Sequence, residues 1–279
     1  MPIQTAAELV GGIVLIFVLA YLAVRSRSID VPGAALGALI SFAAFLAGSI
    51  SWLVIIIAFF GISSFTTRVR YDYKKKLGSA QEKGGLRSWP NTVANGMVAG
   101  IAAVAEIFTH QEVFVVAFLG SIAAAMCDTI ATEIGLLSRS KPRYILNLRK
   151  FVEPGTSGGV SLLGELAGIA SALGIAALGI FLGIVSGSRL ALISAFFAVV
   201  ISAILATNFD SFLGSTLQGQ NRCRVCGART ESARHHGKST VRERGIRMLD
   251  NNGVNLIATI AAALIAVGLY LALTVSQSA

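Results

Sequence analysis

Charged residues are scarce in this sequence. Asp, Glu, Lys and Arg account for 13% of its 279 residues, whereas a soluble domain carries about 25%. Hydrophobic residues account for 54%, and the mean hydropathy is +0.74. Apolar runs near the roughly 20 residues that a membrane-spanning helix needs recur along the whole chain. The composition therefore excludes a soluble globular domain and predicts a polytopic membrane protein.

Cysteine and a signal-peptide pattern are also lacking. Three cysteines are too few for a disulfide framework. The first apolar run, from Leu9 to Val24, has no basic region before it and no small-residue cleavage site, and Arg25 and Arg27 follow it. This run is therefore interpreted as a transmembrane helix rather than a secretory signal.

The hydropathy pattern predicts an all-α helical bundle that forms a single integral membrane domain over residues 1–279. We place eight membrane-spanning helices at residues 8–24, 32–48, 50–66, 91–109, 113–137, 157–185, 190–217 and 252–275. An even number of spans puts both termini on the same side of the membrane.

Positive charge is nearly absent from one side of this bundle. The connections 25–31, 67–90, 138–156 and 218–251 contain 22 of the 23 Lys and Arg, and the opposite connections contain only Arg189. Basic loops stay in the cytoplasm, so both termini are expected outside. We expect the plasma membrane of a prokaryote, with the active site on the cytoplasmic side. Because basic loops explain the pI of 9.9, no nucleic-acid partner is predicted.

Three carboxylates lie inside predicted spans at a similar depth. At about 1.5 Å of rise per residue, Asp128 lies about 14 Å, Glu165 about 12 Å and Asp210 about 10 Å from the cytoplasmic ends of their helices. Glu106 lies near the outer end of its span. A charge in the hydrocarbon core costs at least about 2.5–3.5 kcal/mol, so such groups face the bundle interior and usually have a partner.

A structural role is the alternative for these carboxylates, which would then pair with Lys or Arg from the loops. This alternative is strongest for Glu133, which lies about 140° around the helix from Asp128. Thr132 and Gly135, in contrast, share the face of Asp128. The choice between a functional and a structural role stays open for Glu165.

Three helices start from the basic loops with small polar residues: "PNTVANG" (90–96), "PGTSGGVS" (154–161) and "DNNGVN" (250–255). The free N–H groups of a helix N-terminus suit a phosphate. Capping and small-residue packing are the alternative explanation. Asn95 and Asn255, however, lie a full turn inside their helices, and Arg149 and Lys150 shortly precede the Gly-rich turn.

Carboxylates, amides, helix N-termini and basic groups at one depth favour Mg²⁺-dependent phosphoryl chemistry, since Mg²⁺ takes one or two carboxylates plus phosphate oxygens. We assign Asp128, Asp210 and Lys150 as catalytic residues, the two acids as Mg²⁺ ligands. Supporting Mg²⁺ ligands are Asn208, Asn252 and Asn255. Candidates for binding nucleotide or phosphate are Arg149, Gly155, Thr156, Ser157, Gly158, Gly159, Asn91, Asn95 and Thr132. Further supporting candidates are Glu133, Glu165, Asp250 and Asn251.

The blocks "DTIATEIG", "PGTSGGVSLLGELAG", "TNFDSFLGSTLQG" and "LDNNGVN" resemble a polytopic membrane family that contains chloroplast phytyl-phosphate kinase and human transmembrane protein nineteen. The resemblance runs from about Asn91 to the C-terminus. The first three spans match in hydropathy only. Most members of that family have no assigned activity.

The segment from Asp128 to Gly159 resembles, more distantly, the polyprenol kinase and phosphatidate cytidylyltransferase membrane enzymes. The matching positions are Asp128, Ala131, Gly135, Lys150, Glu153, Gly155 and Thr156. Pro154 and the Ser157-Gly158-Gly159 run depart from that pattern, which puts the nucleotide preference in doubt. The resemblance implies CTP or another NTP as donor, Mg²⁺, and an isoprenoid acceptor.

A separate candidate metal site lies on the last basic loop. Cys223 and Cys226 form a "CRVCG" pair, followed by His235 and His236. Two thiolates and an imidazole at this spacing could bind a structural Zn²⁺. An ordinary basic loop is the alternative.

These observations predict an integral membrane kinase that phosphorylates an isoprenyl monophosphate to the diphosphate. One alternative keeps the site and changes the reaction to a CTP-dependent cytidylyltransferase acting on a lipid phosphate. Another is a non-enzymatic transporter of an anionic lipid or metabolite, which would favour polar groups across the full membrane thickness. The sequence leaves open whether the chain forms a homo-oligomer.

Overall fold

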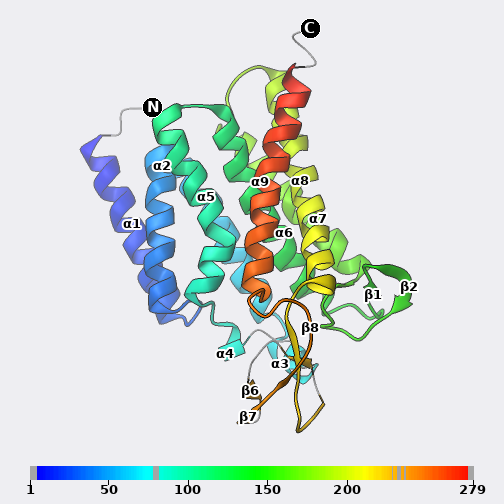
Figure 1. Ribbon diagram of the computed structural model, residues 1–279. Helices are drawn as coiled ribbons and strands as arrows, with labels where there is room; N and C mark the ends of the chain where they lie inside the picture. Colours follow the sequence, from blue (N-terminus) through cyan, green and yellow to red (C-terminus); the bar gives the residue numbers. More distant parts are fainter. Residues whose placement is uncertain (1–4, 78–81, 228, 231–233, 236, 276–279) are drawn as a thin grey trace.

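The computed structural model describes residues 5–77, 82–227, 229–230, 234–235 and 237–275. Its long helices form one bundle with the short elements gathered at one end (Figure 1). The long helices are α1 (Ala6–Arg25), α2 (Val31–Arg68), α5 (Trp89–Thr109), α6 (Glu112–Gly135), α7 (Leu162–Phe181), α8 (Arg189–Thr216) and α9 (Asn251–Val275). All seven are long and apolar enough to cross a membrane. The predicted all-α membrane fold is confirmed.

Helix α2 doubles back on itself. Gly48 and Ser49 have non-helical backbone angles within its 38 residues, and a straight helix of that length would span about 57 Å. Arg68 at its end donates to the Ser26 carbonyl (2.6 Å) and the Ser28 hydroxyl (2.9 Å), just before its start. The two arms, 31–47 and 50–68, therefore lie antiparallel and correspond to the predicted second and third spans.

The fold-back of α2 makes the number of membrane crossings even. Accordingly, the start of α1 and the end of α9 lie at one end of the bundle, and the connections rich in Lys and Arg lie at the other (Figure 1). The structure thus agrees with the grouping of the basic loops. Which side of the membrane they face stays a prediction.

Helix α6 forms the centre of the bundle. Every residue from Val115 to Cys127 is buried, and the helix contacts α2, α5, α7, α8 and α9. A helix that is apolar all round belongs in the interior of a bundle. Asp128, immediately after this run, is therefore held by the most rigidly enclosed helix of the protein.

Small residues bring α7 close to α6. A Cβ added at Gly164 would lie 2.5 Å from the Ala131 carbonyl oxygen, and one at Gly168 would lie 3.0 Å from the Cys127 carbonyl oxygen. Gly164 and Gly168 therefore allow the backbones of the two helices to approach closely. Because Glu165 follows Gly164 directly, this crossing places Glu165 near the Asp128 level of α6.

The basic loops contain two short helices and eight short strands. The helices are α3 (Tyr71–Lys76) and α4 (Glu82–Gly85). The strands β1 (Arg143–Tyr144), β2 (Asn147–Phe151) and β3 (Gly159–Val160) form a sheet in the order β2-β1-β3. A second sheet has the order β5-β4-β8, from β4 (Gln220–Arg222), β5 (Arg229–Thr230) and β8 (Val241–Arg244), and β6 (Arg234–His235) pairs with β7 (Lys238–Ser239).

Candidate functional site

A cavity of about 200 Å³ lies at the basic-loop end of α6, α7 and α8. Asp128 of α6, Glu165 of α7 and Asp210 of α8 all line it, together with Asn251 at the start of α9. Thr132 and Gly135 line it on the Asp128 face of α6, as the helical period predicts. Three carboxylates from three helices thus share one cavity.

Asp128 makes no hydrogen bond and no ion pair with any residue that the structure describes. The structural alternative required a Lys or Arg partner, and the described ion pairs are Lys74 with Glu133 and Lys141 with Glu153. A half-buried carboxylate without a protein cation costs free energy that a bound cation would recover. Among the described residues, Asp128 therefore lacks the ion-pair partner that the structural alternative predicts.

Asp210 is contacted by the amide of Asn255, one turn inside α9. Oriented to satisfy its neighbours, this amide donates to Asp210 Oδ2 (2.9 Å) and to the Asn251 carbonyl (3.0 Å). A second, much smaller cavity of about 10 Å³ is lined by Asp128, Asp210, Asn95 and Asn255. Asp128 and Asp210 thus line both the larger and the smaller cavity. The buried side chains of Asn95 from α5 and Asn255 from α9 also line the smaller one.

Glu165 is oriented by Asn208. The Asn208 amide donates to Glu165 Oε2 (3.4 Å) and to the Ile204 carbonyl (3.0 Å) one turn earlier in α8. Asn208 therefore reaches a carboxylate of the site, but it lines neither the larger nor the smaller cavity among the described residues.

The Gly-rich turn closes the larger cavity from the loop side. Gly155, Thr156, Ser157, Gly158 and Gly159 all line it. Gly155 and Gly158 have positive φ angles of 81° and 78°, which only glycine adopts without strain. A Cβ at Gly158 would also lie 2.9 Å from the Ser211 carbonyl oxygen, so the turn packs directly on α8.

Hydrogen bonds fix this turn. Ser157 donates to Gln218 Oε1 (3.1 Å), and Thr156 donates to the Glu153 carbonyl (2.7 Å). Ser161 then caps α7 by accepting from the Gly164 N–H (3.1 Å). The turn and the N-terminal end of α7 therefore both line the cavity, and the partial positive charge of that helix end favours an anion.

Arg149 and Lys150 are not brought to this cavity. Both are exposed on β2, and the Lys150 ammonium lies 5.8 Å from the centre of the Tyr144 ring. The antiparallel pairing of β1 with β2 carries them outward, away from the Gly-rich turn that follows (Figure 1). In the order β2-β1-β3, β2 is an edge strand that β1 separates from β3, the strand that continues the Gly-rich turn, so proximity in sequence did not become proximity in space.

The candidate residues Asn91, Asn95 and Asn252 do not all lie at the carboxylate cavities. Asn95 donates to the Asn91 carbonyl (3.0 Å), and Asn91 lines a different, apolar cavity. Asp250 accepts from the Gly253 N–H (2.9 Å) and so caps α9, while Asn252 donates to Asp250 (3.5 Å). Asp250 and Asn252 therefore act at the start of α9 and do not line the two carboxylate cavities.

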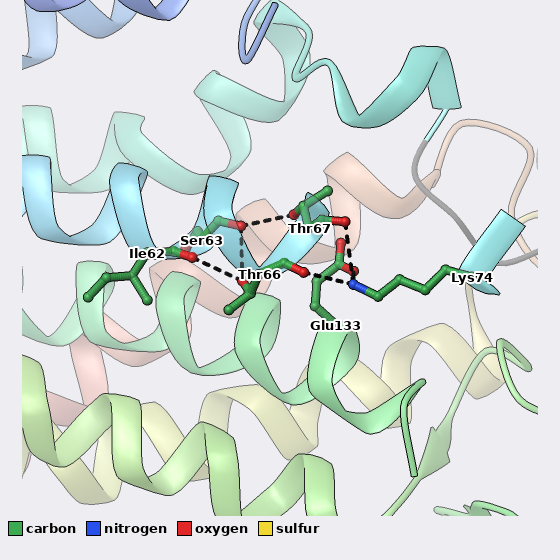
Figure 2. Close-up of polar contacts among 6 residues, drawn as sticks. All are labelled: Ile62, Ser63, Thr66, Thr67, Lys74 and Glu133. Carbon is green, nitrogen blue, oxygen red and sulfur yellow. Dashed lines mark hydrogen bonds and ion pairs between the residues drawn. The ribbon is translucent and has the colours of Figure 1, made fainter. Parts of the chain in front are cut away.

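Glu133 is engaged on the opposite side of α6. Figure 2 shows its carboxylate against Lys74 of α3, at 2.6 Å. The Lys74 ammonium also donates to the Thr66 carbonyl (2.8 Å) at the end of α2. This ion pair is the arrangement that the structural alternative predicted for Glu133, and it leaves Glu133 outside the cavity.

The cysteine pair forms a tight turn between β4 and β5. Gly227 N–H donates to the Cys223 carbonyl (3.0 Å), and Val225 N–H donates to Cys223 Sγ (3.3 Å). Cys223 is buried and Cys226 is exposed. His236 and the side chain of His235 lie outside the described part of the chain. Within that part, no group of three or more His, Cys, Asp or Glu is arranged to hold a metal.

One feature of the membrane interior escaped the sequence reasoning. A cavity of about 580 Å³, lined mainly by apolar side chains, lies among α1, α2 and α5, with Arg87 at its basic-loop end. The signal in the sequence was Arg87 itself, two residues before a span. It was counted there only as one more basic loop residue.

The donor set at Asp128 and Asp210 fits Mg²⁺. Two carboxylates from two helices border one enclosed space beside the turn. Mg²⁺ typically takes only one or two protein carboxylates and completes its shell with phosphate and water oxygens. A third acidic ligand is therefore not required.

The chain belongs to the family described as integral membrane protein DUF92, which matches residues 14–263. It is 32% identical over 169 residues to a membrane protein of Methanocaldococcus jannaschii, a match that covers 61% of this chain and 69% of that protein. It is 27% identical over 270 residues to Protein PGR of Arabidopsis thaliana, covering 90% of this chain and 92% of that protein.

Protein VTE6, chloroplastic, of Arabidopsis thaliana is also similar, at 30% identity over 143 residues, covering 47% of this chain and 42% of that protein. The family resemblance found in the sequence blocks is therefore confirmed. No solved structure matches the chain.

Proposed function

We propose that this member of the DUF92 family is a membrane phosphotransferase that passes a phosphoryl group from CTP or another NTP to an isoprenyl monophosphate. The observation that carries the proposal is the shared cavity of Asp128, Asp210 and the Gly-rich turn at the start of α7. The resemblance to the family that contains chloroplast phytyl-phosphate kinase supports the choice of acceptor.

Asp128 and Asp210 would hold Mg²⁺, which when bound would neutralise charge on the transferring phosphoryl group. The Asn255 amide holds the Asp210 carboxylate in place from α9. Asn208 does the same for Glu165 from α8. These contacts restrict side-chain motion, so little reorganisation would be needed at the moment of reaction.

The Gly-rich turn and the α7 N-terminus would bind the nucleotide phosphates. The turn and the first residues of α7 line the cavity, and the positive φ angles at Gly155 and Gly158 shape the turn around it. An acceptor phosphate oxygen would then attack the γ-phosphorus in line, and the bond to the β–γ bridging oxygen would break, releasing the NDP. In this arrangement Arg149 and Lys150 would contribute only if the β1–β2 hairpin closed over the cavity.

The surroundings of the site match an amphiphilic substrate. The site is lined by the ends of the helices α6, α7 and α8 and by the Gly-rich turn, so a hydrocarbon tail can stay among the helices while the phosphate meets a water-soluble nucleotide. We expect the membrane to be a prokaryotic plasma membrane with this end in the cytoplasm, although one relative is by name chloroplastic.

Product analysis of purified protein tests the proposal. Incubation with isoprenyl monophosphates and each NTP in turn, with Mg²⁺, should give isoprenyl diphosphate and NDP. Release of pyrophosphate would instead indicate the cytidylyltransferase, which the resemblance to phosphatidate cytidylyltransferases keeps as the second candidate. No nucleotide turnover with any acceptor would reject both enzymes and favour a transporter.

A further inference from the structure

The 580 Å³ cavity among α1, α2 and α5 has the size of a ligand site, since pockets for small molecules typically measure about 300–1,000 Å³. Ile16, Phe59 and Phe60 are among its apolar lining residues. Its polar lining gathers at the basic-loop end, where Ser28, Arg68 and Arg87 lie. The cavity is therefore amphiphilic along its length, with a long apolar part and one cationic end.

Arg87 is the unusual residue of this cavity. Its side chain is 94% buried by area, with 6% exposed. The guanidinium carbon lies 5.8 Å and 6.0 Å from the ring centres of Phe59 and Phe60. Among the described residues the guanidinium makes no hydrogen bond, and no carboxylate lies within ion-pair distance. Its five N–H donors therefore have no acceptor within the described part of the chain and can bind an anion in the cavity.

The Arg87 guanidinium is nevertheless charged at neutral pH. Burial lowers the pKa of Arg87 to about 10, and the more distant charge of Glu133 opposes this shift. Glu133 does not neutralise it, because that carboxylate is paired with Lys74 at 2.6 Å. A buried cation of this kind is normally paired, so an anion in the cavity would remove an existing cost.

Two further polar groups face the same space. Ser64 lines the cavity, and its buried hydroxyl has no hydrogen-bond partner among the described residues. Arg68 also lines it, held by its bonds to the Ser26 carbonyl and the Ser28 hydroxyl. A phosphate offers acceptor oxygens to such donors, and arginine matches its geometry by bidentate hydrogen bonding.

Asn95 connects this cavity to the carboxylate site. It lines the apolar cavity on one side and, on the other, the small cavity that Asp128 and Asp210 border. Only Asn95 is common to both lining sets. A head group held at the polar end of the apolar cavity would therefore approach the two aspartates past this amide.

We propose that the cavity among α1, α2 and α5 binds the hydrocarbon tail of the isoprenyl monophosphate, and that Arg87 binds its phosphate. This inference rests on the proposed function for the identity of the acceptor. It assigns the N-terminal helices, which the family model covers from residue 14, a role in substrate binding. Nucleotide and acceptor would then enter the carboxylate site from opposite sides of α6.

Equilibrium binding without nucleotide tests the assignment. The probes are geranylgeranyl monophosphate and geranylgeraniol, which has the same tail without the phosphate. Arg87→Gln should weaken binding of the monophosphate at least tenfold and leave binding of the alcohol unchanged. Arg87→Lys keeps the charge but loses the bidentate geometry, so its affinity for the monophosphate should lie between those of the parent protein and Arg87→Gln. The matched charge control is Arg189→Gln, at the first residue of α8 and outside the cavity lining.

Binding of the hydrocarbon tail can be tested by filling the apolar cavity with a large side chain. A Cβ at Gly37 would have its nearest neighbour at 4.0 Å, on Thr92, and both residues line the cavity. Gly37→Phe should therefore weaken binding of both probes at least tenfold while the protein still folds. Gly174→Phe is the matched control, since a Cβ at Gly174 meets no atom within 4 Å and Gly174 lines neither this cavity nor the carboxylate cavities.

The outcomes separate this inference from the proposed function. Unchanged monophosphate binding in a folded Arg87→Gln protein would overturn the inference while leaving the kinase intact. Arg87-dependent binding without turnover of any NTP would reject the kinase and keep the binding site. Tighter Arg87-dependent binding of phosphatidate, which has two acyl tails, would overturn the isoprenyl assignment in favour of a lipid phosphate.

Discussion

Lys74 and Glu133 form an ion pair that is shielded from solvent, with 2.6 Å between Nζ and Oε2 and side chains 0% and 5% exposed. The pair joins α3, an element of the basic loops, to the central helix α6 (Figure 2). Five residues earlier on α6, Asp128 has no such partner in the described chain. Two acids of one helix thus have opposite environments, which predicts opposite consequences of neutralising them.

Breaking the Lys74–Glu133 pair should destabilise the protein. Lys74→Met would leave Glu133 buried without a cation, and removing one partner of a buried ion pair typically costs about 3–5 kcal/mol. We expect a lower melting temperature and lower yield, with partial recovery in the double variant Lys74→Met, Glu133→Leu. Lys141→Met breaks the exposed pair with Glu153, whose side chains are 62% and 75% exposed, and should change little. Equal effects of the two variants would contradict the structural role.

Neutralising Asp128 or Asp210 should abolish turnover, and at Asp128 it should do so without loss of stability. Asn keeps the size and one oxygen but removes the charge that Mg²⁺ needs, which is worth on the order of 10²–10³ in rate. Because Asp128 has no protein cation to strand, Asp128→Asn should melt no lower than the parent. Glu106→Gln, in α5 and away from the cavity, is the activity control. A folded Asp128→Asn protein with a normal rate would remove Asp128 from the site.

Gly158→Ala should disrupt the Gly-rich turn. The residue has φ of 78°, and its Cβ would meet the Ser211 carbonyl oxygen at 2.9 Å. A strained backbone of this kind costs about 1–3 kcal/mol, so we expect weaker nucleotide binding and a lower melting temperature. Gly174→Ala, where an added Cβ has open space, should be neutral in both measurements. Unaltered nucleotide affinity in Gly158→Ala would show that the turn does not bind phosphate.

The cysteine loop is expected to hold a structural metal. The proposed ligands are Cys223, Cys226 and one of His235 or His236. Elemental analysis of purified protein should find about one Zn²⁺ per chain, and Cys226→Ser should lose it and lower the melting temperature. Metal-free protein with unchanged melting and activity would make this segment an ordinary basic loop.

Thiol labelling in cells tests the orientation. Cys226 is exposed, whereas Cys127 and Cys223 are buried, so a thiol reagent reports mainly on Cys226. The charge asymmetry predicts labelling only after permeabilisation, and labelling from outside at a cysteine introduced in place of Arg189. Labelling of Cys226 in intact cells would reverse the orientation.

The sequence alone predicted the number of crossings, the grouping of the basic loops, and the similar levels of Asp128 and Asp210. The physical reason is that hydropathy, charge distribution and axial rise are properties of each segment by itself. A spanning segment must satisfy its backbone internally, so its length and charge could be interpreted without knowing its neighbours. The predicted depth of Glu165 was wrong, because α7 begins at Leu162 rather than at residue 157 and Glu165 lies in its first turn. The sequence blocks that resemble the family added the expectation of an isoprenoid acceptor.

Only the tertiary structure decided which side chains meet. Axial depth does not say which helices are neighbours, so the Lys74–Glu133 pair and the contact of Asn255 with Asp210 could not be located in advance. Strand pairing carried Lys150 outward, although it precedes the Gly-rich turn in sequence. Conversely, Arg87 was indistinguishable from other loop arginines until the fold-back of α2 placed Phe59 and Phe60 against it. Burial of a charge depends on contacts between distant segments, and it was this burial that separated Arg87 from the other basic residues.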